Sequence, residues 1–143
     1  IVAQAVQQMW KTTLDIEVQI ASQEWQSYLD LLDEDAPQVF RYGWCADYPD
    51  PHNFLSDVYY STSGNNDTNW ANAEYDALLD EAKLMLDFEA RKPLYARAEH
   101  ILTWEDCAIA PIYFYTDLGM KASYLETTDS IIGVERFDKW DIP

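Results

Sequence analysis

Basic residues are scarce in this chain of 143 residues, where nine lysines and arginines stand against 26 aspartates and glutamates and give a formal net charge of −17. Binding to phosphates needs clustered Lys and Arg, so this balance argues against a nucleic-acid partner and against docking on an anionic membrane surface. So many acids most often make a solvated, soluble surface. A metal-binding or cation-attracting face is the less common alternative.

Long apolar runs are absent as well. No stretch of eighteen apolar residues occurs, so we expect no direct insertion of this chain into a membrane. The first residues, IVAQAVQQMW, have neither a basic start nor a small-residue cleavage site, so no signal peptide is predicted. They also lack an initiating Met, and we interpret the chain as beginning inside an amphipathic helix of a longer protein.

Cysteine and histidine are rare, with two of each. Cys45 and Cys107 form no CxxC pair, which argues against a zinc site or a thioredoxin-like site; they could form one disulfide or remain two buried thiols. His52 and His100 fit surface or helix positions better than catalytic ones. No G-x-S-x-G, H-E-x-x-H or P-loop motif occurs, and no acid pair stands out as a glycosidase couple. We therefore predict no enzymatic activity, no metal and no cofactor.

The chain does contain helical and strand-like periodicities in alternation. Apolar residues at helical spacing predict five helices: over 1–13, over 24–33 with Ser22 as a cap, through FLSDVYY (54–60) with Asp50 or Asn53 as a cap, over 73–87 and over 88–105. Alternating or β-branched runs predict strands over 16–20, 38–44, 108–116, 120–126 and 134–143. This order predicts an α/β fold with a mixed sheet flanked by helices.

The most unusual stretch is RYGWCADYPDP, residues 41–51, which overlaps the end of the predicted strand over 38–44. In α/β sheets, ligands gather at the C-terminal ends of strands. Asp47 in this stretch could receive a ligand ammonium group, because charge-assisted hydrogen bonds are strong in a partly dry pocket. A turn-capping role beside the prolines explains the same aspartate equally well.

Other large side chains near this stretch also allow two interpretations. Arg41 could meet a ligand carboxylate, although a structural salt bridge is the commoner use of such an arginine. Trp44 fits the core and a pocket wall equally well. Tyr113 and Tyr115 put two phenols on one face of a predicted strand, for which core packing is the commoner explanation.

At the level of motifs, RYGWCADYPDPHNFL resembles the W-x-A-D-Y-x-x-P-x-x-F-L signature of the oligopeptide-binding and dipeptide-binding proteins of ABC importers, the extracellular solute-binding proteins of family 5. The similarity extends along essentially the whole chain. Four further segments resemble family motifs in the right order: IEVQIASQEWQSYL, NNDTNWANAEYDALLDEA, ARKPLYARAEHIL and AIAPIYFYT. Each motif alone is weak, and together they are specific.

The resemblance implies roles for individual residues. In oligopeptide binders, the aspartate matching Asp47 holds the α-amino group of the peptide, and the arginine matching Arg41 can meet a ligand carboxylate. Trp44 would wall the pocket, and the tyrosine matching Tyr115 lines the cleft. Backbone groups from Gly43 to Cys45 would pair with the extended peptide, in the manner of strand addition.

The resemblance also implies a fold and a function. The chain, residues 1–143, would be part of the C-terminal lobe of a type II periplasmic-binding-protein-like fold, with 117–143 returning towards an N-terminal lobe. The protein would capture short peptides in a hinge-closing cleft and deliver them to an ABC transporter permease. It would work as a monomer in the periplasm or outside the cell, where a lipid on an N-terminus that precedes this chain could anchor it.

Two other functions remain open at this point. Members of the same family bind nickel chelates or cello-oligosaccharides on the same scaffold, so the fold does not fix the ligand. A carbohydrate-active enzyme domain, with acids for catalysis and tryptophans for sugar stacking, is the alternative from a different class of protein.

Two residues depart from the family pattern. Asp15 stands where relatives carry Gly and has to tolerate a turn conformation, which Asp does better than most residues. Cys107 stands where a small residue is common. In some relatives the cysteine matching Cys45 pairs with one upstream, so Cys45 could bond Cys107, lack a partner or be a free thiol. Of these we predict a Cys45–Cys107 disulfide.

Overall fold

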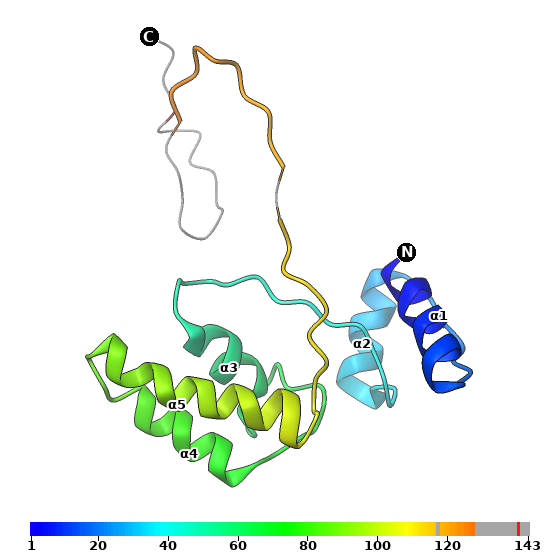
Figure 1. Cartoon of the computed structure of the whole chain (residues 1–143), viewed down its shortest axis with the longest axis horizontal. Helices are drawn as coiled ribbons and strands as arrows, with labels where there is room; N and C mark the ends of the chain where they lie inside the picture. The colour runs from blue at the N-terminus through cyan, green and yellow to red at the C-terminus, as the bar shows by residue number, and fades with distance from the viewer. Residues whose placement is uncertain (117, 128–139, 141–143) are drawn as a thin grey trace. The chain divides into compact units, whose positions relative to one another are not determined.

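The computed structural model describes residues 1–116, 118–127 and 140. It divides into two units, Ile1–Gly43 and Trp44–Pro143. The first unit contains α1 (Val2–Leu14) and α2 (Trp25–Asp35), both labelled in Figure 1. The second unit contains α3 (Pro51–Tyr59), α4 (Ala73–Ala82), α5 (Phe88–His100) and the π-helical turn η1 (Ile101–Glu105) that continues α5. All five predicted helices are therefore confirmed.

Several helix ends differ from the prediction, among them the start of α3, which begins at Pro51. Glu24, and not Ser22, caps α2, and its carboxylate accepts hydrogen bonds from the N–H groups of Gln26 and Ser27. The helix expected over 73–87 ends at Ala82. Two leucines beyond it, Leu84 and Leu86, are exposed and so have no apolar surface to hold them in a further helical turn.

In the first unit, the chain turns back against α1. Asp15 ends α1 in the left-handed conformation with φ 54°, so the expected turn conformation at this position is confirmed. The Gln7 side-chain amide then donates to the carbonyl of Val18 over 2.6 Å, and Lys11 pairs with Glu17. These contacts hold the segment after α1 along the side of the helix.

The mixed sheet is not confirmed. The segments 16–20, 38–44 and 108–116 run as irregular chain, and an isolated bridge at Glu126 is the one β feature among the described residues. A strand is stable only when a neighbouring strand satisfies its N–H and C=O groups, and these segments find no such neighbour in the described part of the chain. The strand expected over 134–143 lies outside the described residues except for Trp140.

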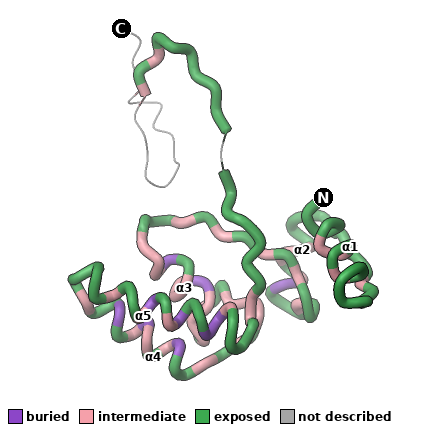
Figure 2. Tube along the Cα trace, in the orientation of Figure 1, coloured by how far each residue is buried: buried purple, intermediate pink, exposed green. Residues whose placement is uncertain are grey.

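The core of the second unit lies between α4, α5 and η1. Figure 2 shows the buried positions gathered on these helices and on α3. The cluster consists of Tyr75, Leu79, Ala82, Tyr95, Ala98, Ile101 and Leu102. The buried Tyr75 hydroxyl donates to the Leu55 carbonyl over 2.8 Å, which ties α3 to this core.

The loop over 61–72 is fixed to the start of α4 and to Asp106, which follows η1. Asn72 caps α4 by accepting from the N–H groups of Glu74 and Tyr75. The Asn72 amide and the Trp70 indole both donate to Asp106 over 2.9 Å. The two hydrogen bonds lower the pKa of Asp106, with the Asn72 bond the stronger cause. This polar loop is therefore an ordered part of the second unit.

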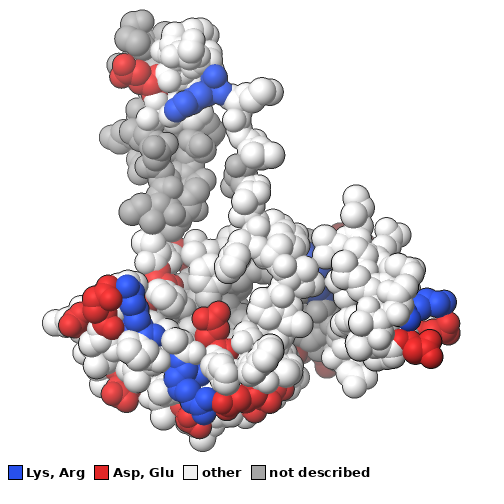
Figure 3. Space-filling view, in the orientation of Figure 1, with Lys and Arg blue, Asp and Glu red and all other residues white. Residues whose placement is uncertain are grey.

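Most of the described basic residues of the second unit are paired with acids, whereas Lys121 donates to the Thr127 hydroxyl. Figure 3 shows lysine and arginine side chains interspersed with acids on the viewed face. Arg97 bonds both Glu74 and Glu105, Lys83 pairs with Asp80, and Lys92 pairs with Glu89. Such exposed pairs contribute little stability and keep the surface solvated. Within the described residues, no helix has the length and apolar character needed to cross a membrane.

Candidate functional site

The segment before α3 is shaped by the start of that helix. Asp50 caps α3 by accepting a hydrogen bond from the His52 N–H over 2.9 Å, and Pro51 occupies the first helical position. A proline is well tolerated there, because the first N–H of a helix has no intrahelical partner. Of the two caps expected from the sequence, Asp50 is the correct one. The residues from Trp44 to Asp50 therefore enter α3 along a defined path.

Asn53, in the first turn of α3, joins this segment to the helix. Its side chain is 1% exposed. Its Oδ1 accepts hydrogen bonds from the Trp44 indole N–H (2.9 Å) and from the backbone N–H of Asp47 (3.0 Å). Its Nδ2 donates to carboxylate oxygens of Asp47 (3.2 Å) and Asp57 (2.9 Å). All four hydrogen bonds that an asparagine side chain can make are formed.

This arrangement brings two of the predicted ligand-binding residues together. Trp44 is half-buried and Asp47 is exposed, and both are held by Asn53. The Asp47 Oδ2 oxygen is bonded to Asn53, whereas Oδ1 makes no hydrogen bond to another described residue. The carboxylate thus presents an oriented oxygen to solvent, which is the geometry needed to receive a cation.

The remaining predicted residues are divided between the two units. Arg41 and Gly43 lie in the first, and Trp44, Cys45, Asp47 and Tyr115 lie in the second. Arg41 is exposed, and its carbonyl accepts a hydrogen bond from the Tyr28 hydroxyl. Tyr115 is half exposed and packs edge-on against Tyr113, with ring centroids 4.9 Å apart. The structure therefore places Trp44 and Asp47 together around Asn53. It does not test whether the predicted residues as a group bind a ligand.

The predicted disulfide is absent. Cys45 and Cys107 are both exposed and free. Cys107 has φ 50° directly after η1, and its Sγ donates to the Trp104 carbonyl over 3.4 Å. A disulfide needs its two sulfurs about 2 Å apart. Both thiols are free in this structure, so it does not contain the predicted bond.

An ion pair fixes the cap of α3. The Arg91 guanidinium, from α5, meets both oxygens of Asp50, at 2.7 and 3.0 Å. Its side chain is 15% exposed and that of Asp50 23%. Burial alone would raise the pKa of Asp50, but the hydrogen bond from the His52 N–H and the Arg91 charge outweigh it and lower the pKa. Arg91 also bonds the Tyr95 hydroxyl and lies over its ring.

Asp57 connects the site to one more side chain. Its Oδ2 accepts from the Tyr48 hydroxyl over 2.7 Å, in addition to the Asn53 amide. Burial, followed by the hydrogen bond to the Asp57 carboxylate, raises the pKa of Tyr48 to about 12. A neutral phenol can donate to a carboxylate, whereas a phenolate beside it would be repelled.

We expect this tyrosine to make the second unit less stable in alkali. The folded state holds the Tyr48 proton more tightly than the unfolded chain, whose tyrosines titrate near pH 10. Its contribution is therefore complete below about pH 10 and is lost as the pH rises towards 12. Thermal unfolding of Tyr48→Phe should show a smaller loss of Tm between these pH values than the wild type. Equal losses in the two proteins would rule this contribution out.

Sequence reasoning overlooked Asn53, Asp57 and Arg91 as parts of the site. It considered Asn53 only as an alternative cap. The spacing of Asn53 and Asp57, four residues apart on one helix, indicates that they share a face. The partner of Asp50 lies 41 residues along the chain, and no local pattern points to it.

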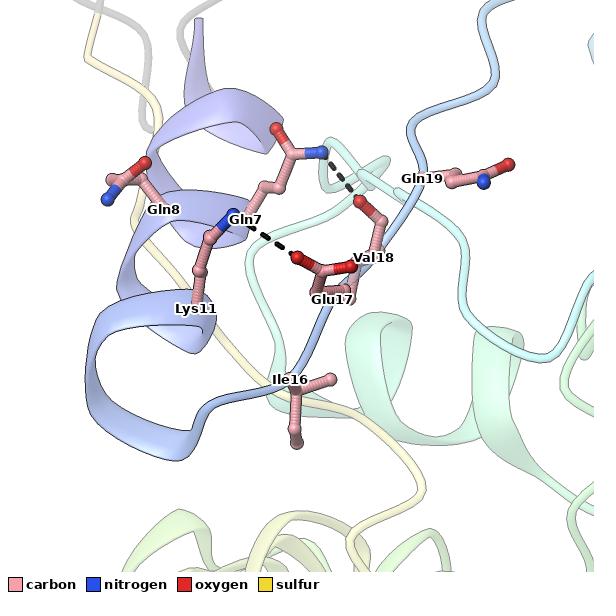
Figure 4. Close-up of a pocket in the computed structure, with 7 residues that line it drawn as sticks. All are labelled: Gln7, Gln8, Lys11, Ile16, Glu17, Val18 and Gln19. Carbon is pink, nitrogen blue, oxygen red and sulfur yellow. Dashed lines mark hydrogen bonds and ion pairs between the residues drawn. The ribbon is translucent and has the colours of Figure 1, made fainter.

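The first unit contains an open pocket of about 590 Å³. Figure 4 shows the Gln7 and Lys11 side chains reaching from α1 towards the segment after it. The lining is mostly polar: Gln7, Gln8, Lys11, Ile16, Glu17, Val18 and Gln19. None of the predicted ligand-binding residues belongs to it. No group of three or more potential metal ligands occurs in the residues that the structure describes.

Comparison with known proteins gives one consistent family. Residues 1–66 match the model of the bacterial extracellular solute-binding proteins, family 5 middle. The oligopeptide-binding protein OppA of Bacillus subtilis (strain 168) is 42% identical over 125 residues, which are 87% of this chain and 23% of that protein.

Two solved structures are similar over most of the chain. One is the murein tripeptide binding protein MppA of Escherichia coli, with a TM-score of 0.78 and 36% identity over 88% of this chain and 24% of that chain. The other is OppA of Haemophilus influenzae in complex with RPPGFSPFR, with a TM-score of 0.78 and 36% identity over 87% and 24%. This chain thus spans about a quarter of the length of these relatives. The chain belongs to the bacterial extracellular solute-binding proteins of family 5.

Proposed function

We propose that this chain is part of the C-terminal lobe of a longer protein that captures short peptides for an ABC importer and delivers them to its permease. The observation that carries the proposal is the exposed Asp47 carboxylate, oriented by Asn53 beside the half-buried Trp44. Relatives named for binding oligopeptides and murein tripeptide support the same class of ligand. They are binding proteins, so we propose a binding function and no catalysis.

In this function, Asp47 would receive the α-amino group of the peptide, and Trp44 would wall the pocket around it. Arg41 would meet a ligand carboxylate and Tyr115 would line the cleft. Backbone groups from Gly43 to Cys45 would pair with the extended peptide. Such a cleft would recognise the backbone and the terminal charge and would hold side chains loosely.

The complete protein would have the type II periplasmic-binding-protein-like fold. The segments 16–20, 38–44 and 108–116 would then pair with strands supplied by the rest of the protein and form the mixed sheet. Residues 117–143 would return towards the N-terminal lobe. A protein of this kind would act as a monomer in the periplasm or outside the cell, where a lipid anchor is one way to hold it.

A panel of ligand classes tests the proposal. The full-length protein, freed of bound ligand, is titrated with short peptides, cello-oligosaccharides and nickel chelates, and tryptophan fluorescence reports binding. We expect saturable binding of peptides alone. Saturable binding of a sugar or a nickel chelate without peptide binding would agree with the proposed fold and would contradict the proposed peptide ligand. Turnover of a chromogenic glycoside would favour the enzyme alternative.

A further inference from the structure

The four hydrogen bonds of Asn53 determine which way its amide points. Two N–H donors, from the Trp44 indole and the Asp47 backbone, face one end of the side chain, and two carboxylates face the other end. Only the amide oxygen can accept from the donors, and only the NH₂ group can donate to the carboxylates. The orientation is therefore set by the chemistry of its neighbours.

The same chemistry explains why an asparagine is needed at this position. An aspartate would place a third carboxylate beside Asp47 and Asp57 and would have no hydrogen to donate to either. A residue without a polar side chain would leave the half-buried Trp44 indole N–H and the Asp47 N–H without their acceptor. Only a side chain with a donor and an acceptor end meets all four partners.

Asn53 holds Asp47 at two points, the backbone N–H and one carboxylate oxygen. With Oδ2 bonded to Asn53, rotation of the Asp47 carboxylate is restricted and Oδ1 is left to face solvent. A flexible exposed aspartate would lose conformational freedom each time it bound a cation, whereas an oriented one has less to lose. Preorganisation of this kind raises the affinity for the group that Asp47 binds.

We propose that Asn53 is a positioning residue that sets the preference for ligands with a free amino terminus, by holding Asp47 with one carboxylate oxygen directed at the ligand ammonium group. The proposal rests on the proposed function, in which Asp47 receives that group. Asn53 touches no ligand in this account and acts only through Asp47.

The test compares two forms of one short peptide, with a free and with an acetylated amino terminus, on the full-length protein. The measured quantity is the ratio of their dissociation constants. In Asn53→Ala we expect this ratio to fall about tenfold, because affinity for the free amine drops while affinity for the acetylated peptide changes little. Asn53→Ser, whose single hydroxyl cannot reach both carboxylates, should show the same change and replaces the alanine variant if that does not fold.

A matched control separates positioning from stability. Asn72→Ala removes an asparagine with a similar set of hydrogen bonds, at the start of α4. It should lower stability and leave the ratio unchanged. In an Asp47→Asn background, Asn53→Ala should have no further effect on the ratio, because its action passes through the Asp47 carboxylate.

The outcomes are distinct. A wild-type protein that prefers the free amine and an Asn53→Ala variant that keeps the full preference would overturn the role of Asn53 and leave the proposed function intact. Equal weakening of both peptides in Asn53→Ala would also overturn it, as an effect of folding alone. A wild-type protein that binds both peptides equally would overturn the role of Asp47 and, with it, this proposal.

Discussion

Replacing Asp47 with asparagine in the full-length protein should weaken the binding of a short peptide with a free amino terminus by at least about tenfold. Removing one partner of a charge pair in a binding site commonly costs about 2–5 kcal/mol. Asp47 is exposed before a lobe closes over it, so we expect an effect near the lower end of this range. Isothermal titration calorimetry of both proteins with the same peptide measures the change.

A control variant tests whether the loss is specific. Asp80→Asn removes the same charge from α4, where Asp80 is exposed to solvent at its pair with Lys83. It should leave peptide affinity within about twofold of the wild type, because exposed charges are strongly screened. If Asp80→Asn and Asp47→Asn weaken binding equally, a general effect of net charge explains the result, and Asp47 is not the ammonium receptor.

Arg91→Ala should lower the free energy of unfolding by about 2 kcal/mol. Loss of one partner from a fully buried ion pair costs about 3–5 kcal/mol, because it leaves an uncompensated charge. The Arg91 and Asp50 side chains are 15% and 23% exposed, so water screens part of this effect. The variant also loses the hydrogen bond and ring contact with Tyr95. Urea unfolding of the full-length protein, followed by circular dichroism, measures the change.

The neighbouring lysine provides a matched comparison. Lys92 pairs with Glu89 in an exposed position on the same helix, so Lys92→Ala should cost less than about 0.5 kcal/mol. The loss of unfolding free energy in Arg91→Lys should lie between the losses in these two alanine variants, because a lysine keeps the charge but cannot bond both oxygens of Asp50. A loss in Arg91→Ala no larger than that in Lys92→Ala would show that the ion pair does not stabilise the start of α3.

The effect of Arg91 should also depend on pH. The folded state lowers the pKa of Asp50 below its value in the unfolded chain, which is near 4. The stabilisation from Asp50 is therefore present above that pH and is lost as the pH falls through the folded-state pKa. The difference in stability between wild type and Arg91→Ala should accordingly shrink as the pH falls below about 4.

Helices were predictable here because their signals are local. Apolar spacing and capping residues operate within a few turns, and α1 to α5 follow them closely. The left-handed turn at Asp15 was expected from the resemblance, because relatives carry Gly at this position and few other residues tolerate that conformation. Strands cannot be predicted from local signals in the same way. Strands at 16–20 and 38–44 would need hydrogen-bond partners from elsewhere in the chain.

The candidate residues could be chosen from the sequence by their chemistry, but most of the side chains that support them could not. Trp44 and Asp47 are recognisable in the sequence, because a large aromatic and a carboxylate lie close to two prolines. The side chain that holds them, Asn53, lies in the first turn of α3, and the ion pair that fixes the cap of this helix comes from α5. Asn53 had a recognisable spacing to Asp57, whereas Arg91 reaches Asp50 from a different helix. The predicted disulfide is not formed in this structure, and the presence of two cysteines in a sequence does not show where their sulfurs point.

The central claim is that Asp47 receives the amino group of a peptide, and one measurement tests it most directly. Calorimetry on the full-length protein compares one short peptide with its N-acetylated form, which has the same sequence and no ammonium charge. We predict tight binding of the free peptide and binding of the acetylated form weaker by at least about tenfold. Equal affinity for the two peptides, or no binding of either, would contradict the account.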